Sequence, residues 1–263
     1  MSYLKRNDGR NFAGLAIVAC VALSISTASA AEWGTIKGRF VFKGTAPTPA
    51  KIKVDKDVAV CAKHPLVDES IVVGKDGELA NVFIYSREKD LAVHPEYKET
   101  AEANVEMDNK FCRYSPHCAV LRTSQTLVLK NTDAVAHNVK GDPFKNGSFN
   151  ILIPPNGEVP KKFTATETLP ATVGCNIHPW MSGFVLIRED PYMAVSGEDG
   201  TFEIKNVPVG EVEFQLWQEK AGYLDGVTVQ GKPAKKGRVK INVKPGVLDL
   251  GDIVVDAKLL KGK

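Results

Sequence analysis

Four residues with metal-binding side chains occur between positions 137 and 181. Cys175, His178 and Met181 lie within seven residues that read Cys-Asn-Ile-His-Pro-Trp-Met, and His137 precedes Cys175 by 38 residues. A thiolate, two imidazoles and a weak axial thioether are the ligand set of a blue-copper electron-transfer site. Such a set is acceptable both to Cu(I), which prefers soft sulfur, and to Cu(II), which prefers nitrogen. The pattern therefore predicts a copper site that exchanges one electron.

Zinc is the closest competitor for this site because it also binds cysteine and histidine. The thioether of Met181 favours copper, since soft sulfur ligands select that metal. A dinuclear copper centre would need a second cysteine in the loop, and Asn176 and Ile177 offer none. We therefore expect one type 1 copper ion, with His137, Cys175 and His178 as equatorial ligands and Met181 as the axial ligand.

The segments that must position these ligands are typical of strands. Short runs rich in Val, Ile, Phe and Thr alternate with Gly, Pro, Asn and Asp. The candidate strands are Thr35–Phe42, Ser70–Val73, Asn81–Tyr85, Gln125–Lys130, Lys161–Ala165, Gly183–Arg188, Thr201–Ile204, Glu211–Trp217, Arg238–Val243 and Asp252–Val255. This spacing predicts an all-β protein built from sandwiches or barrels, with a loop or short helix over 86–104.

A domain boundary is predicted at Glu189-Asp190-Pro191, where a strand ends at charged residues and proline. Residues 31–190 would then form the copper domain, and 191–257 a smaller β domain. In the second domain the strands over 201–204 and 211–217 alternate apolar and polar residues, which places one face on a core and the other in water.

The first 30 residues have the three-part layout of a secretory signal peptide. Lys5, Arg6 and Arg10 precede the apolar run Phe12–Leu23, and Ala28-Ser29-Ala30 forms a small-residue cleavage site. An alternative is lipid attachment at Cys20, which would tether the protein; cleavage there would fall within the apolar run, so we favour release after residue 30. The leader predicts a periplasmic or secreted protein, in a compartment where disulfides persist.

Composition excludes some classes of function. The net charge of the whole chain is +3. Without residues 1–30 the chain keeps 31 basic and 30 acidic residues, a net charge of +1. No long Lys/Arg cluster is present, so nucleic acid is not expected as a partner. No apolar run reaches the roughly 18 residues of a membrane helix, so no membrane span is expected.

The C-terminal third resembles the carboxypeptidase-regulatory-like, transthyretin-type β-sandwich. The resemblance rests on Asp199-Gly200-Thr201-Phe202, followed by Pro208-Val209-Gly210. The first strand of that family often reads Gly-x-Val-x-Gly, and Gly34-Thr35-Ile36-Lys37-Gly38 is similar to it. The resemblance implies that residues 34–44 pair with the C-terminal domain and that the middle domain is inserted between them.

The middle of the chain resembles the cupredoxins. His137-Asn138-Val139 followed by Cys175-x2-His178-x2-Met181 matches their ligand pattern, and the short loop is similar to the amicyanin type. The stretch 150–158 also resembles the strand and turn before that loop. Together with 68–70 and 112–117, the pattern resembles exported bacterial cupredoxin-like proteins of the methylamine-utilisation type. A Greek-key β-sandwich is the fold that this resemblance implies.

The resemblance also implies roles for residues around the ligands. Asn138 would hydrogen-bond the ligand loop and hold Cys175 in place. Pro179 and Trp180 would stiffen the loop and surround an exposed edge of His178, through which electrons would enter and leave.

Cysteine counting leaves three candidates for disulfides in the chain after residue 30. With Cys175 assigned to the metal, Cys61, Cys112 and Cys118 remain, and three pairings are formally open. The family pattern implies Cys61–Cys112, with Cys118 as a buried free thiol. An alternative is a second metal site in which Cys61, His64, Cys112 and His117 would bind zinc.

These patterns predict a copper protein that is not an enzyme and that carries single electrons between redox proteins, such as a c-type cytochrome or a dehydrogenase. Two alternatives remain open. The site could carry copper without redox turnover, or the C-terminal sandwich could bind carbohydrate or the cell surface.

Overall fold

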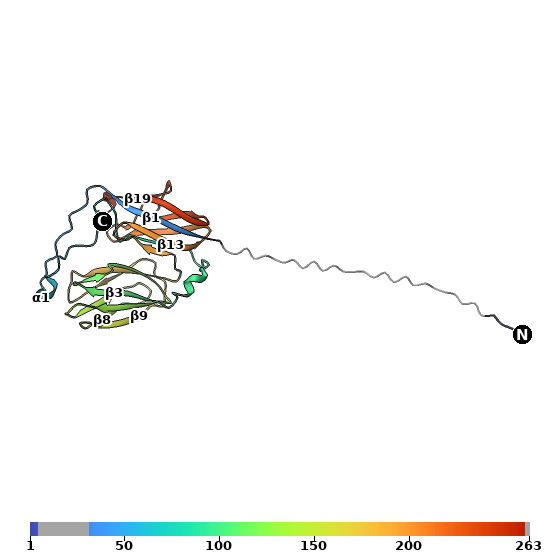
Figure 1. Ribbon diagram of the computed structural model, residues 1–263, viewed down its shortest axis with the longest axis horizontal. Helices are drawn as coiled ribbons and strands as arrows, with labels where there is room; N and C mark the ends of the chain where they lie inside the picture. The colour runs from blue at the N-terminus through green and yellow to red at the C-terminus, as the bar shows by residue number, and fades with distance from the viewer. Residues whose placement is uncertain (5–31, 261–263) are drawn as a thin grey trace. The chain divides into compact units, whose positions relative to one another are not determined.

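The computed structural model describes residues 1–4 and 32–260 (Figure 1). Nearly all of the predicted signal peptide, including Cys20, lies outside the described residues. Within them, no helix has the length and apolar character needed to cross a membrane. The described chain is almost entirely β structure, which confirms the predicted fold class. The three short helices are α1 (Val58–Cys61), η1 (Pro95–Lys98) and η2 (Ala257–Leu260).

The middle of the chain forms a sandwich of two sheets. One sheet has the order β5-β11-β10-β7-β8, and the other has the order β4-β3-β6-β9. Leu121, Leu127, Val139 and Ile187 are fully buried in the core that both sheets share. The strands are β3 (Asn104–Lys110), β4 (Arg113–Ser115), β5 (Cys118–Arg122), β6 (Thr126–Asn131), β7 (His137–Gly141), β8 (Phe149–Ile153), β9 (Glu158–Lys162), β10 (Ala171–Gly174) and β11 (Ser182–Arg188). We call this unit the metal sandwich.

The second sandwich contains the C-terminal strands. Its sheets have the orders β13-β1-β19 and β12-β2-β14-β15, with β18 paired to β14. Phe40, Phe214 and Ile253 are fully buried in its core. The strands are β1 (Trp33–Lys43), β2 (Phe83–Ser86), β12 (Met193–Val195), β13 (Thr201–Pro208), β14 (Gly210–Gln218), β15 (Gly222–Tyr223), β18 (Arg238–Val243) and β19 (Gly246–Asp256), and β16 (Thr228–Val229) pairs separately with β17 (Lys232–Pro233).

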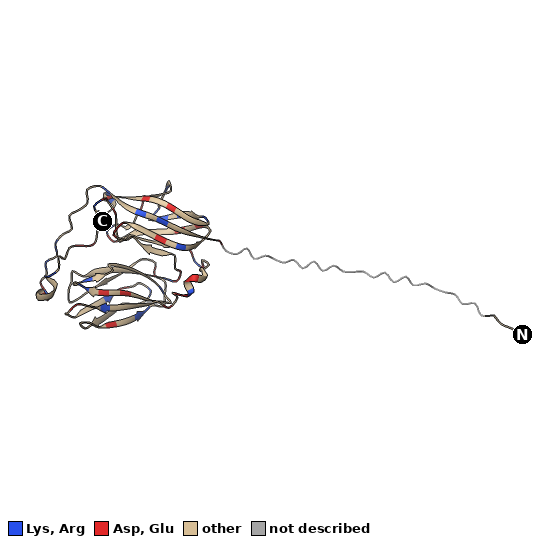
Figure 2. Cartoon of the chain, in the orientation of Figure 1, with Lys and Arg blue, Asp and Glu red and all other residues tan. Residues whose placement is uncertain are grey.

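Basic and acidic residues both occur along the strands of the two sandwiches (Figure 2). On neighbouring β1 and β19, Arg39 Nε donates to Asp252 Oδ1 at 2.9 Å, and Lys37 lies 3.5 Å from Asp249. All four side chains are roughly half exposed, so water screens both pairs and they add little to stability. The alternation of polar and buried residues along β1 determines which face of the strand packs on the core, and the exposed ion pairs contribute little beyond that.

The N-terminal strands belong to the second sandwich. β1 runs antiparallel to β13 and parallel to β19, as the resemblance of 34–44 implied (Figure 1). β2 also pairs there, with Ile84 opposite Leu216 of β14. The segment 31–190 is therefore not one domain, which corrects the predicted boundary. The metal sandwich is instead inserted between β2 and β12, because the apolar faces of β1 and β2 complete the C-terminal core.

Two other sequence predictions differ from the structure. Residues 70–73 make only an isolated bridge, Val73 to Leu79, in place of a strand. The strand expected over 161–165 is β9, which ends at Lys162. Strand β3 was missed because its sequence, Asn-Val-Glu-Met-Asp-Asn-Lys, is mostly polar, although it buries Met107 and Asn109 between its neighbours.

An apolar cluster joins the two sandwiches. Phe184 of β11 packs against Trp217 of β14 with ring centroids 5.0 Å apart, and Phe83 of β2 lies 5.6 Å from the same indole. The buried Arg188 guanidinium donates to the Ser86 carbonyl at 2.8 Å. These contacts tie the inserted sandwich to the strands that flank it.

A long segment between β1 and β2, residues 45–68, reaches the metal sandwich and is here called the strap. It carries α1, and a disulfide joins its Cys61 to Cys112 in the turn between β3 and β4. Leu66 of the strap packs with this disulfide, and Ile52 and Val54 lie against it. The strap is thus held to the sandwich by one covalent bond and a small apolar cluster.

Candidate metal centre

Adjacent strands bring the predicted ligands together. His137 begins β7, and Cys175 to Met181 form the loop between β10 and β11. β10 pairs with β7, with Gly174 opposite Lys140, so the loop emerges beside His137. The side chains of His137 and His178 are fully buried, and Cys175 and Met181 are also buried.

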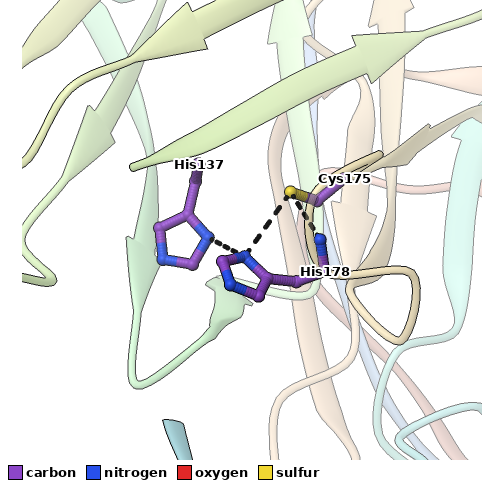
Figure 3. Close-up of side chains that lie close together, drawn as sticks. All are labelled: His137, Cys175 and His178. Carbon is purple, nitrogen blue, oxygen red and sulfur yellow. Dashed lines mark hydrogen bonds between the residues drawn. The ribbon is translucent and has the colours of Figure 1, made fainter. Parts of the chain in front are cut away.

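The two imidazoles and the thiol converge closely (Figure 3). The Nδ1 atoms of His137 and His178 are 2.9 Å apart, and Cys175 Sγ lies 3.8 Å from Nδ1 of His178. All three ligand atoms lie within 4.8 Å of one another. Two ligands bound to one ion at about 2.0–2.3 Å are themselves separated by about 3.3–3.8 Å. The spacing therefore fits a single ion, with a small outward movement of the two rings.

The close approach of the two ring nitrogens also requires a proton or a metal ion between them. An unprotonated Nδ1 carries a lone pair, and two lone pairs 2.9 Å apart need a proton or a cation between them. A buried thiol beside them adds a soft anionic ligand once it is deprotonated. This donor set fits copper, and without a metal ion one proton shared between the two Nδ1 atoms would satisfy the same contact.

Each imidazole donates a hydrogen bond from its other ring nitrogen to an aspartate. His137 Nε2 lies 2.9 Å from Asp133 Oδ2, and His178 Nε2 lies 2.8 Å from Asp57 Oδ2. A carboxylate only accepts hydrogen bonds, so Nε2 carries the proton in both rings and Nδ1 is left for a metal. Sequence reasoning missed both aspartates. Asp133 is four residues before His137, which was a usable signal, but Asp57 is 121 residues from its partner.

The same contacts shift the protonation equilibria of the site. Burial alone would lower the pKa of His137, but hydrogen bonds with Asp133 and Cys175 raise it above its ordinary value. Burial alone would raise the pKa of the Cys175 thiol. The hydrogen bond with His137 and the backbone N–H groups of Asn138 and His178 outweigh this and lower the pKa. The thiolate, which is the form that binds metal, is therefore easier to form at Cys175 than at an ordinary cysteine.

Asn138 fastens the ligand loop to β7. Its side-chain Oδ1 accepts hydrogen bonds from the backbone N–H of Asn176 at 2.9 Å and of Ile177 at 3.3 Å. Its Nδ2 donates to Asn150 Oδ1 on β8 at 2.7 Å, and its backbone N–H points at Cys175 Sγ at 3.5 Å. The contact between Asn138 and the loop that the cupredoxin resemblance implied is present.

Met181 closes the loop by backbone contacts. Its N–H donates to the His178 carbonyl at 2.9 Å, and its own carbonyl accepts from the N–H of Cys175 at 3.3 Å. The side chain is 2 % exposed and belongs to the same core cluster as Cys175. Its role as the axial ligand stays a prediction.

The expected exposed edge of His178 is not present, which corrects that prediction. The imidazole is fully buried because Asp57 of the strap covers its Nε2. Trp180 is half-buried, with its ring centroid 5.1 Å from that of His178, and its Nε1 donates to the Cys112 carbonyl at 3.0 Å. Pro179 is the exposed member of this part of the loop.

The cysteines pair as the resemblance implied. Cys61 and Cys112 form a disulfide, and Cys118 is a free, buried thiol whose pKa is raised by burial. The alternative zinc site is wrong because the disulfide consumes both of its thiols. Its two histidines have other partners: His64 stacks on Phe111 at 4.6 Å, and His117 Nε2 lies 2.8 Å from Glu219.

Comparison with protein-family models finds no match, and none of the curated proteins matches either. Partial matches exist among solved structures. A purple cupredoxin from Nitrosopumilus maritimus shares 20 % identity with a TM-score of 0.27, covering 32 % of this chain and 98 % of the cupredoxin. The Cu(I) form of an amicyanin variant shares 18 % identity with a TM-score of 0.30, covering 40 % of this chain and 98 % of the amicyanin.

A third match is the copper-containing nitrite reductase NirK from Thermus scotoductus SA-01. It shares 18 % identity with a TM-score of 0.31 and covers 33 % of this chain. The present chain covers only 22 % of that enzyme. At this identity and overlap the three structures are similar to one part of the chain, and the likeness assigns no function to it.

Proposed function

We propose that this protein is a type 1 copper protein that transfers single electrons between redox partners. The observation that carries the proposal is the buried convergence of Cys175 Sγ with the Nδ1 atoms of His137 and His178. A bound copper ion would supply a one-electron couple at this point. The ligands would be these three residues, with Met181 as the axial thioether.

The chain's own residues would hold the ligands still during electron transfer. Asn138 keeps the loop against β7, and the hydrogen bonds to Cys175 Sγ favour a thiolate of fixed orientation. Because the ligands come from a strand end and one short loop, little rearrangement accompanies a change of oxidation state. The proposed role involves no chemical step on a substrate, so the protein would be a carrier and not an enzyme. We also propose that this activity lies outside the cytoplasm, on the basis of the leader expected from the sequence of residues 1–30.

An absorption spectrum of the protein expressed without residues 1–30 tests the copper assignment. Titration with Cu(II) should saturate at one ion per chain and produce an intense visible thiolate-to-copper band. Cys175→Ser should lack this band, and Cys118→Ser, which removes the other free thiol, should keep it. An equally intense band in the Cys175→Ser protein would refute the site.

A copper carrier without redox turnover is a second candidate, and the buried His178 is the observation that favours it. The two functions can be distinguished by the redox behaviour of the bound copper and by whether the protein releases it. An electron carrier should show a reversible potential and fast electron exchange with a small redox protein. A copper carrier should remain Cu(I) and colourless and should pass its ion to an acceptor chelator.

A further inference from the structure

Two aspartates outside the ligand set contact both imidazoles of the proposed metal centre. Asp133 accepts from His137 Nε2, and Asp57 accepts from His178 Nε2, at 2.9 and 2.8 Å. The Asp133 side chain is 6 % exposed, whereas that of Asp57 is 41 % exposed. Both rings are fully buried, so the carboxylates act on the rings with little water between them.

One residue, Cys112, fixes both carboxylates in place. Its backbone N–H donates to Asp133 Oδ2 at 2.8 Å, beside a bond from Phe111 N–H to Oδ1 at 2.7 Å. Its side chain holds the strap through the disulfide to Cys61, four residues after Asp57. The turn between β3 and β4 therefore positions both aspartates from a single point.

We propose that Asp57 and Asp133 are positioning residues that aim both Nδ1 atoms at one copper ion and hold that ion toward Cu(II). The inference rests on the proposed function. Cu(II) carries one more positive charge than Cu(I), so two nearby carboxylates stabilise it more. A carboxylate on the ring N–H also makes an imidazole a more basic ligand. The centre should therefore have a low reduction potential for its ligand set.

Isosteric substitutions test the charge. Asp133→Asn should raise the affinity for Cu(I) relative to Cu(II) at least tenfold, which is a shift of about 59 mV to more positive potential. Asp57→Asn should give a smaller, several-fold change because water screens its more exposed carboxylate. Asp55→Asn is the matched control, since it removes the same charge from an exposed position on the strap. Voltammetry of the copper-loaded proteins measures all three. Unchanged potentials in both Asp133→Asn and Asp57→Asn would overturn the proposal.

The positioning role has its own readout in the metal-free protein. Two slowly exchanging imidazole Nε2–H signals are expected in 1H–15N spectra, one from each histidine. Asp57→Ala should lose the His178 signal, and Asp133→Ala should lose the His137 signal, whereas the Asn variants should keep both. Retention of both signals in the Ala variants would refute the positioning. Absence of the thiolate band in the wild-type copper protein would instead overturn the proposed function, and with it the charge role.

Discussion

Removal of the Cys61–Cys112 disulfide should destabilise the metal sandwich strongly. The bond closes a loop between residues 51 apart in sequence. In the chain-entropy description, a loop of this length restricts the unfolded chain by about 4 kcal/mol, within the range of about 2–5 kcal/mol measured for native disulfides. For a protein of this size, about 1 kcal/mol corresponds to 2–4 °C, so the expected fall in melting temperature is about 8–16 °C.

The assay is thermal and guanidinium unfolding of the Cys61→Ala, Cys112→Ala double variant in the metal-free state. Trp180 is a local fluorescence probe, because its indole donates to the Cys112 carbonyl. Cys118→Ala is the control; it removes a buried thiol without opening a cross-link, and we expect it to cost about 1 kcal/mol. A double variant that unfolds within about 1 kcal/mol of the wild type would contradict the reasoning, because the apolar contacts of the strap and the Asp57–His178 hydrogen bond would then hold it without the disulfide.

Three further predictions concern the site itself. Asn138→Ala should cost about 2–4 kcal/mol, since it removes two partly buried hydrogen bonds to the loop and one to Asn150 of β8; denaturant unfolding measures this, with Asn242→Ala, at an exposed position of β18, as control. Copper removal by a chelator should lower the melting temperature of wild-type protein but leave Cys175→Ser unchanged. The pKa of Asp133 is held low by His137 and two backbone N–H groups, which outweigh burial. Its contribution to stability should therefore be complete above about pH 4 and decline as pH falls through the folded pKa, with a flatter acid profile in Asp133→Asn.

The ligand cluster could be predicted from the sequence because three of its four residues lie on one short loop. Cys175, His178 and Met181 lie three residues apart on one segment, so their proximity needs no knowledge of the fold. The pairing of Asp57 with His178 could not be read, because it depends on a strap whose path is set by a disulfide between residues 51 apart. The buried state of His178 follows from that same contact and was missed for the same reason.

For the domains, the sequence likewise predicted where strands lie but not how they pair. The alternating pattern of Thr201–Ile204 and Glu211–Trp217 predicted real strands, β13 and β14. The same patterns do not state which strand lies beside which. Strand β2 was placed with the copper domain by its position in the chain, although its apolar side chains fit the C-terminal core. Partner choice in a sheet depends on the shape of the whole core, which local alternation does not encode.

The placement of β1 has a consequence for the order of folding. Arg39 of β1 and its partner Asp252 on β19 are 213 residues apart, so this pairing needs almost the whole chain. The metal sandwich draws its strands from one continuous stretch, β3 to β11, and closes its core without either terminus. Contacts between distant residues form slowly because a long loop must close first. We therefore expect the inserted sandwich to fold before the one that surrounds it, while the edge of β1 that pairs with β19 stays open until that last strand is in place.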